Sequence, residues 1–535
     1  MMDTGSGPTR SPWIPFCLVV ATVVAIAPPV FVTCRALGLA PLAGGIVTAA
    51  LLAILLAVTR RGIGNTLVGA ARSKPALFGL WFLLFLFAGY RMGGLSVFMM
   101  DVEQTSYAFQ RTIRTFDDPK LAKPFFLKHN CFTCYMVASH LASKRVDNIY
   151  DSKYYRDAEE PTPIHETIND KLDIDRYQYP PPFLVLPRAL QALGGDFFTW
   201  RSLWFALNLL AFTATVGALA VWLRADGFSA AWFIWPAVLA APSAMGALQI
   251  ENAHVLIITL SVGGMLAFEM KRAWLGALLL GFTVVAKIFP GVLLVYLALR
   301  GKWRAVLWTV GAMSAYVLVA IGLFGLKPFE SFIHYQIPRL ASGEAFSFAW
   351  EYIHPMIVNS SAMGVAYKLE KLGLGVDPAG LAKVLVWMHT ALLLIVLVVA
   401  GWKRRRVFTD DSSQEQSDGL RLNVVRVWLV LLILGQMRSP FLPWTYGNVA
   451  VLWLLALLIP SQGKRWIKMV LLGAVWCVYA TTLPLPFGPS GITLDLVYAL
   501  AATCGVLFLC AGLVFLQARA GAGDASSPTR PLTSS

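Results

Sequence analysis

Charged side chains are scarce in this sequence. Asp, Glu, Lys and Arg together make up only 14% of its 535 residues, whereas hydrophobic types make up 57% and the mean hydropathy is +0.64. Soluble domains carry about a quarter of their residues as charged types. The shortage of charge therefore excludes an ordinary soluble protein and predicts a polytopic membrane protein.

Nucleotide-binding and metal-binding motifs are also missing. The sequence has no P-loop, no glycine-rich dinucleotide fingerprint and no His-Glu-x-x-His. Cysteine is sparse, and Cys131 and Cys134 have redox spacing without a surrounding βαβ pattern, a second pair or a nearby set of histidines. We therefore expect no cofactor and no metal ion, and either a structural disulfide or two unpaired thiols at this pair. The other cysteines lie in or beside apolar runs, where they most often pack as small residues: Cys17, Cys34, Cys477, Cys504 and Cys510.

The basic residues cluster in short hinges between apolar runs. The formal net charge of +15 comes from 44 basic and 29 acidic residues and would by itself suit a nucleic-acid partner. Hinge clusters, however, are typical of the cytoplasmic loops of membrane proteins. We therefore expect no nucleic acid, and a multi-pass protein of the plasma or inner membrane with both termini in the cytoplasm. The clusters are Arg60-Arg61, Lys271-Arg272, Lys403-Arg404-Arg405-Arg406 and Lys464-Arg465.

Apolar runs of membrane-spanning length divide the chain into segments. They predict an all-α polytopic fold of about fourteen membrane helices, with spans at 200–223 and 230–248 joined by a short turn. The predicted segments are three spans in 1–90, an exoplasmic polar insert in 91–196, membrane helices in 197–325, a second exoplasmic loop in 326–380, C-terminal membrane helices in 381–517 with a cytoplasmic loop at 403–423, and a disordered tail in 518–535.

One apolar run carries a lysine in its middle. Residues 274–299 are too long for one ordinary span, begin and end at basic hinges, and contain Lys287 followed by Pro290. We predict two short helices with Lys287 near the exoplasmic turn, because proline breaks a helix and both hinges should face the cytoplasm. An ammonium group there is costly and is usually kept for a phosphate or a carboxylate, with snorkelling to the surface as the alternative.

Two further breaks between apolar runs contain polar side chains. Gln249, Glu251, Asn252 and His254 lie in one break, and Arg438 lies in the other. Both breaks are predicted on the same exoplasmic side as Lys287, so the same reasoning makes these residues candidate binding groups.

The exoplasmic insert supplies candidate acids. Asp101 follows the third span by about ten residues, so its carboxylate would lie at the membrane surface as a general base, with a solvated loop acid as the alternative. Glu103 and Asp151 are the other candidates for this role. The insert ends in Tyr179-Pro180-Pro181-Pro182-Phe183, which taken alone indicates an extended structural anchor at the membrane interface.

Several short stretches between residues 130 and 444 occur in an order that resembles a known family. They are Cys131 to Ala138 with Asn148 to Asp151, Tyr179 to Phe183 with Trp204 and Asn208, Gln249 with Asn252, Ala286 to Pro290, Asn359 to Ser361, and Ser439-Pro440 with Trp444. They are similar to the Asp-Phe-x-x-Tyr-Tyr-x-Ala and Tyr-Asp, Tyr-Pro-Pro-x-Phe, Gln-x-x-Asn, Ala-x-Lys-x-x-Pro, Asn-x-Ser and Ser-Pro-x-x-Trp stretches of glycosyltransferase family 87. These are the bacterial mannosyltransferase-like proteins of the polyprenyl-phosphate-sugar-dependent C superfamily.

Two positions depart from the family pattern. Cys131 stands where the family has an acid before Phe132, so the usual catalytic base cannot be carried over to that position. Asp101 is our substitute, because it keeps an acid soon after a span. The family's histidines after the Ser-Pro-x-x-Trp stretch are also missing, with Tyr446 nearby.

The resemblance implies an integral membrane hexosyltransferase. It would transfer a hexose, with mannose as the expected sugar, from a polyprenyl-phosphate-linked donor to a lipid or envelope-glycan acceptor on the exoplasmic side. A carboxylate would deprotonate the acceptor hydroxyl as it attacks the anomeric carbon, and cations would stabilise the departing phosphate. The candidate substrate-binding residues are Lys287, Arg438 and Arg176 for the phosphate, together with Tyr179, Gln249, Asn252 and Asn359.

Two other classes of function stay open. A transporter or flippase for a lipid-linked saccharide would also show intramembrane charge and broken helices. The sequence shows no convincing repeat between its halves, and most of its polar residues are predicted on one face, which favours an enzyme. The loss of the family acid at Cys131 makes a catalytically silent scaffold for envelope assembly the third class.

Cysteine-accessibility labelling tests the predicted topology. Single cysteines at Asp118, Glu160 and Gly343 should react with a membrane-impermeant maleimide added to intact cells, because these positions lie in the predicted exoplasmic segments. Cysteines at Arg61, Arg405 and Ser417 should react only after the membrane is permeabilised. Labelling of the Arg405 position in intact cells would overturn the whole topology.

Overall fold

The computed structural model describes residues 13–59, 75–100, 129–156, 158–168, 171–402, 414–459, 466–481 and 492–523. Six helices in these residues are long and apolar enough to cross a membrane, or seven if the pair Ala231–Leu239 and Pro242–Gln249, bent by 72°, is one span. Five shorter apolar helices of 10–17 residues accompany them. The chain is a multi-pass membrane protein, and the predicted all-α polytopic fold is confirmed, while the number of about fourteen membrane helices stays a prediction.

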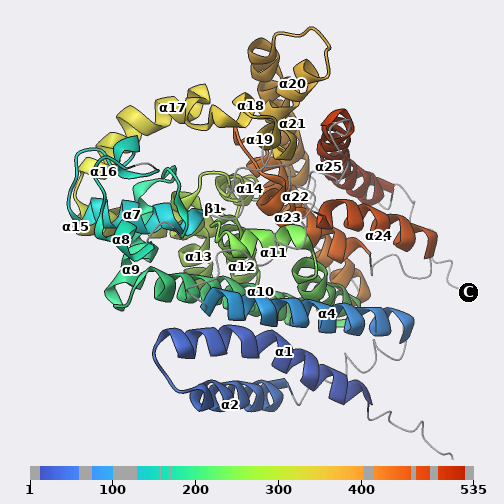
Figure 1. The fold of residues 1–535 in the computed structure, drawn as a ribbon. Helices are drawn as coiled ribbons and strands as arrows, with labels where there is room; N and C mark the ends of the chain where they lie inside the picture. Colours follow the sequence, from blue (N-terminus) through green and yellow to red (C-terminus); the bar gives the residue numbers. More distant parts are fainter. Residues whose placement is uncertain are drawn as a thin grey trace, which may run out of the picture.

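The N-terminal helices pack along one side of the molecule (Figure 1). They are α1 (Trp13–Ala36), α2 (Pro41–Thr59) and α4 (Pro75–Met100), and α1 and α4 both contact α10. Helix α4 runs ten residues beyond the predicted end of the third span at residue 90. The helix continues because the Arg91 guanidinium is bound within the protein. It donates to the Ala240 carbonyl at 3.0 Å and lies 5.7 Å from the Phe87 ring centre. The third span therefore continues about two and a half helical turns past Arg91, the charged residue at which the insert is predicted to begin.

Helix α10 (Phe197–Leu239) is a single helix of 43 residues, where the sequence suggested two spans joined by a short turn. The break comes later, at Ala241, and α11 (Pro242–Gln249) follows it. Ala241 has extended backbone angles (φ −75°, ψ 125°) because a residue that precedes proline is sterically kept out of the helical region. The helix therefore ends at a proline rather than at the polar residues near 224–227.

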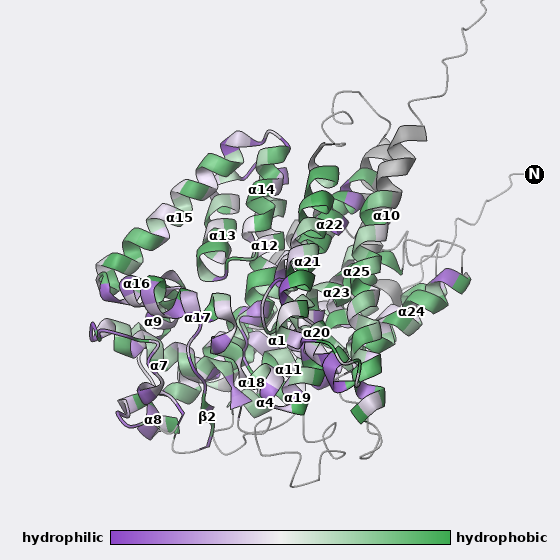
Figure 2. Cartoon of the chain, turned by 90° about the horizontal axis from the view of Figure 1, so that it is seen from above, coloured by the Kyte–Doolittle hydropathy of each residue, from purple (hydrophilic) through white to green (hydrophobic). Residues whose placement is uncertain are grey.

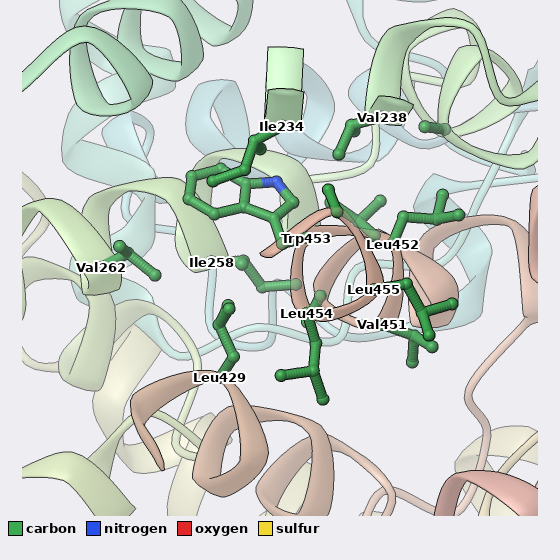
Figure 3. Packing of buried hydrophobic residues seen from close by; sticks show 14 of the residues in the cluster. Ile234, Val238, Ile258, Val262, Leu429, Val451, Leu452, Trp453, Leu454 and Leu455 are labelled. Carbon is green, nitrogen blue, oxygen red and sulfur yellow. The ribbon is translucent and has the colours of Figure 1, made fainter. Parts of the chain in front are cut away.

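Two helices near the C-terminus form the centre of the apolar core. Helix α23 (Trp444–Leu458) is buried on almost every side, as expected for a helix that is hydrophobic all round, and it packs against α22 (Gln414–Gln436) and α10. The Trp453 ring meets Phe212 edge to face at 5.1 Å. Figure 3 shows the neighbouring side chains of this core, which include Ile234, Val238, Ile258, Val262, Leu429, Val451, Leu452, Leu454 and Leu455.

The apolar run with the central lysine folds as predicted. It forms two short helices, α13 (Ala273–Ala286) and α14 (Gly291–Leu299), with Lys287 in extended conformation at the end of α13 (φ −155°, ψ 112°). Their neighbours are α12 (His254–Glu269) and α15 (Trp303–Phe324). The break therefore places a lysine side chain between two membrane helices.

A polar layer covers one end of these helices. We use this name for residues 129–192 and 327–371. Figure 2 shows hydrophilic residues gathered around α8 and α16, and hydrophobic residues along α13, α14 and α15. The first part contains β1 (His129–Asn130), α7 (Cys131–Ser143), η1 (Ser152–Tyr154), α8 (Pro163–Ile168), β2 (Asp173–Ile174), η2 (Pro181–Leu184) and α9 (Val185–Ala192). The second contains α16 (Lys327–Ser331), η3 (Phe332–Gln336), α17 (Ile337–Ser342), η4 (Glu344–Phe346), α18 (Phe348–Glu351), α19 (Ile353–Val358) and α20 (Ala362–Lys371).

The two parts of the polar layer are joined by polar contacts. Lys327 forms an ion pair with Asp147, and Gln336 donates to Gln178. Three helices complete the fold: α21 (Pro378–Trp402), α24 (Trp466–Ala480) and α25 (Ile492–Gly523). Polar contacts therefore join segments that lie 158 and 180 residues apart in the sequence.

Asn359 joins the polar layer to the break between α22 and α23. Its Oδ1 accepts from the backbone N–H groups of Ser361 and Leu442, both at 3.0 Å, and its Nδ2 donates to the Pro440 carbonyl at 3.1 Å. The side chain is only 1% exposed, and the buried Lys368 ammonium donates to the Asn359 carbonyl. We call these contacts the Asn359 junction.

Removing the Asn359 amide should destabilise the protein. Asn359→Ala leaves the Leu442 N–H and the Pro440 carbonyl without this partner, and a buried unsatisfied group costs about 1–3 kcal/mol. We expect a lower thermal unfolding midpoint in detergent, measured by tryptophan fluorescence, with Ser342→Ala at the exposed end of α17 as the unchanged control. An unchanged midpoint for Asn359→Ala would contradict the structural role.

Candidate functional site

The Lys287 ammonium lies among aromatic and imidazole groups. Its Nζ is 2.5 Å from His254 Nδ1 and 3.3 Å from the Tyr179 hydroxyl. It also lies 4.8 Å from the ring centre of Tyr179 and 5.7 Å from that of Tyr446, at cation–π distances. We call Tyr179, His254, Lys287 and Tyr446 the Lys287 cluster. These partners are uncharged when His254 is neutral, so none of them neutralises a charge on Lys287.

Two tyrosine hydroxyls and the proline stretch that follows Tyr179 hold it in this position. The Tyr135 hydroxyl donates to the Tyr179 hydroxyl at 3.1 Å, and the Tyr150 hydroxyl donates to the Tyr179 carbonyl at 2.9 Å. Pro180 is extended (φ −61°, ψ 152°) and leads into η2, where the Phe183 ring stacks on Tyr179 at 4.9 Å. The stretch is thus an anchor, as its composition indicates, and the residue that it anchors contacts Lys287.

The break between α11 and α12 adds polar groups beside the cluster. Asn252 donates from Nδ2 to Cys131 Sγ at 3.2 Å and accepts from the His254 N–H at 3.0 Å. Glu251 is buried with φ 56°, a conformation that is strained for a residue with a side chain. Its Oε2 accepts from Asn130 at 3.0 Å. Strained backbone and a buried acid at one break are typical of a functional region.

A chain of hydrogen-bonding side chains adjoins Asn252. Cys131 begins α7, and His129 lies two residues earlier in β1, with its Nε2 at 3.5 Å from Cys131 Sγ. The other ring nitrogen, Nδ1, is 3.1 Å from Asp175 Oδ1. We call these residues the Cys131 triad. Cys131 and Cys134 are both free thiols in this structure, and Cys134 Sγ lies 3.1 Å from the Cys131 carbonyl, so the unpaired-thiol alternative holds here.

Strand pairing and neighbouring charges determine the protonation state of His129. The parallel pairing of β1 with β2 sets His129 opposite Asp173 and brings Asp175 beside the ring. Burial lowers the pKa of His129, but the adjacent Asp175 carboxylate and Cys131 sulfur raise it, so that the net pKa lies well above the ordinary histidine value. The imidazolium form is therefore favoured next to the sulfur.

Within the described residues, the triad is also the one group whose residue types suit a metal ion. Its three donor atoms lie within 4.8 Å of one another. The imidazole, however, lies between the other two side chains and directs one nitrogen to each of them. A metal ion needs its ligand atoms to converge on one point, so this arrangement fits a hydrogen-bonded chain better.

The other predicted site residues lie elsewhere or serve other contacts. Asp101 and Glu103 are outside the described residues. Asp151 caps η1 by accepting from the Lys153 N–H at 3.2 Å. Arg438 Nε donates to Thr390 Oγ1 at 2.9 Å, away from the Lys287 cluster.

Three more candidates are placed but not brought to the cluster. Gln249 is buried, and its carbonyl lies 3.5 Å from Asn130 Nδ2. Arg176 is exposed beside the triad, and the Asn359 side chain is engaged in the Asn359 junction. The structure therefore brings together Tyr179, Asn252 and Lys287 out of the predicted set, and the binding roles of all these residues stay predictions.

Sequence reasoning missed His129, Asp175 and Tyr135. The sequence offers no period or motif that pairs residue 129 with residue 175, because two-residue strands leave no alternation to read. The available signal is the spacing of His129 and Cys131: a histidine two residues before a thiol can be its hydrogen-bond partner.

Comparison with known proteins adds to this geometry. Residues 177–434 match the model of glycosyltransferase family 87. A polyprenol-phosphate-mannose-dependent alpha-(1-2)-phosphatidylinositol mannoside mannosyltransferase of Mycolicibacterium smegmatis is 24% identical over 245 residues, which are 46% of this chain and 49% of that protein. The chain thus matches about half the length of this curated relative, and no solved structure matches it. The family match contains the break at Lys287 and three members of its cluster, and the resemblance to glycosyltransferase family 87 read from the sequence is confirmed over these residues.

Proposed function

We propose that this protein is a membrane hexosyltransferase that uses a polyprenyl-phosphate-linked sugar. The observation that carries the proposal is the Lys287 ammonium, placed in a helix break where its contacts within the described part of the chain are a hydroxyl, an imidazole and aromatic rings. A positive charge without a carboxylate partner suits a lipid phosphate that arrives from the bilayer. The family and the mannose-dependent relative support mannose as the sugar.

The proposed reaction is a single displacement at the anomeric carbon. The acceptor hydroxyl loses its proton to a base while its oxygen attacks, and the bond between the anomeric carbon and the phosphate oxygen breaks. Lys287 stabilises the negative charge that collects on the departing phosphate. Tyr179 contacts Lys287 and Asn252 contacts the His254 backbone, which supports a role for both in binding the donor head group, and Asp101, Glu103 and Asp151 are the bases suggested by the sequence alone.

The acceptor and the orientation belong to the same proposal. The relative's name gives a lipid-linked mannoside as its acceptor, which supports a lipid or envelope-glycan acceptor for this chain. The hinge charges support a plasma-membrane or inner-membrane protein with cytoplasmic termini and with the polar layer on the exoplasmic side.

A transfer assay with purified full-length protein in proteoliposomes tests the proposal. Radiolabelled polyprenyl-phosphate mannose is the donor and octyl α-mannoside is the acceptor probe, with GDP-mannose as the comparison donor. We expect label in the mannoside product from the lipid-linked donor alone. Donor that crosses the bilayer without transfer would instead support a flippase, and neither transfer nor crossing would support a silent scaffold.

Lys287 should determine use of the donor. Lys287→Ala should lower kcat/KM for the donor by about a hundredfold or more, because a lost charge contact to a phosphate in a low-dielectric site costs several kcal/mol. Lys287→Arg should keep part of the activity, since a guanidinium also binds phosphate.

The matched control for this experiment is Lys383→Ala, which removes an exposed lysine from α21. It should transfer mannose at the parental rate. If Lys287→Ala fails to accumulate in the membrane, Lys287 is a structural residue. If it folds and transfers normally, the phosphate assignment is wrong.

A further inference from the structure

We propose that Cys131 is the catalytic base of this transferase and acts as a thiolate, with His129 and Asp175 as the positioning residues that keep it ionised. This inference rests on the proposed function and names a residue for its proton-transfer step. It differs from the sequence-based assignment of the base to Asp101.

The hydrogen bonds around Cys131 Sγ suit an anion. Asn252 Nδ2 can only donate, and it lies 3.2 Å from the sulfur. His129 Nε2 lies 3.5 Å away, and Asp175 Oδ1 binds the opposite ring nitrogen. A carboxylate accepts the proton of Nδ1, so a protonated His129 directs its second N–H at the sulfur. Both neighbours are therefore donors, and the sulfur is the acceptor.

Positive charge is also concentrated around the sulfur. Cys131 is the first residue of α7, which has 13 residues, and the N-terminal end of a helix favours negative charge. The raised pKa of His129 favours its imidazolium form beside the sulfur. These are the surroundings in which proteins hold reactive thiolates.

The triad adjoins the proposed phosphate site. Asn252 contacts Cys131 Sγ with its amide nitrogen and the His254 N–H with its amide oxygen, and His254 contacts Lys287. A base and a phosphate-binding cation are thus separated by one asparagine and one histidine. The His129 and Asp175 side chains are 13% and 24% exposed and Cys131 is 8% exposed, so the triad lies close beneath the surface of the polar layer.

The proton transfer and the sugar transfer need no reactant other than the donor and the acceptor. The acceptor O–H gives its proton to the Cys131 thiolate, which becomes a thiol. The acceptor oxygen forms a bond to the anomeric carbon, and the carbon–oxygen bond to the lipid phosphate breaks with its electron pair on the phosphate oxygen. Loss of the thiol proton to solvent restores the thiolate, and the configuration at the anomeric carbon is inverted.

Several titratable groups bear on the pH dependence of this step. They interact electrostatically with Cys131 or with its partners. They are His129 and Asp175 at the strand pair, Cys134 and Tyr135 on α7, Tyr179 before η2, Lys287 after α13, and Tyr446 on α23. Among these groups, His129 lies within hydrogen-bonding distance of the sulfur, and its other ring nitrogen pairs with the Asp175 carboxylate.

The ionised state can be tested without any transfer activity. Full-length protein in detergent is treated with iodoacetamide from about pH 5 to pH 9, and alkylation of Cys131 is followed by peptide mass spectrometry, because only the thiolate reacts. We expect His129→Gln and Asp175→Asn to slow alkylation near pH 6 by about tenfold and to move its onset to higher pH. An unchanged onset in both variants would overturn the positioning roles.

The catalytic role is tested in the proteoliposome transfer assay. Cys131→Ser should lower kcat by about a hundredfold or more, the usual contribution of a general base, with a small change in the donor KM. Cys131→Asp should restore a measurable part of the rate, and His129→Gln should no longer matter in that background. Cys477→Ala, which removes an exposed free thiol from α24, is the matched control and should keep the parental rate.

Four other experimental results would each contradict one part of the proposal. Parental activity in Cys131→Ser, together with loss of activity in Asp101→Asn, would overturn the thiolate base. Mannose found covalently on Cys131 would make it a nucleophile, and one tightly bound metal ion per protein, lost in Cys131→Ser, would make the triad a metal site. If the parent protein transfers no mannose but His129 still controls alkylation, the proposed function fails and the thiolate assignment holds.

Discussion

Every interrupted helix in a membrane leaves backbone N–H and C=O groups that lipid cannot satisfy. In this protein the polar layer supplies partners for two such breaks. At the break between α11 and α12, the Ile250 carbonyl accepts from the Cys131 N–H at 2.8 Å and the Ala253 N–H donates to the Tyr135 hydroxyl at 3.2 Å. At the break between α22 and α23, the Leu442 N–H donates to Asn359 and the Leu442 carbonyl accepts from the Ser360 N–H.

This dependence explains where the polar chemistry collects. A segment that pairs with a broken helix is held against it by directional bonds, so α7 begins at the α11–α12 break instead of lying loosely above the membrane. The same bonds bring Cys131 to Asn252 and Tyr135 to Tyr179. The break at Lys287 then faces side chains that two other elements have already positioned. The stability of the breaks and the geometry of the site thus have one cause.

In our proposal, the chain lacks the family's acid at Cys131 and still holds an anionic group at that position. Cys131 stands where the resemblance led us to expect an acid, and a thiol in an apolar setting would be neutral. Here His129 and Asp175 are joined through a parallel strand pair of only two residues each. The pair adds a carboxylate and an imidazole to the sulfur, so the charge that one side chain would carry is distributed over three.

The sequence by itself determined what depends on local physics. Apolar runs gave the membrane fold, a lysine followed by a proline gave the break between α13 and α14, and the proline stretch after Tyr179 gave an extended anchor. Only the tertiary structure decided features that depend on distant partners. Helix α4 continues past residue 90 because Arg91 reaches the Ala240 carbonyl, and the Asn359 amide is engaged by backbone some eighty residues away. His129 meets Asp175 through a strand pairing too short to leave a pattern, because hydrogen bonds between distant segments depend on the path of the chain and not on the period of its residues.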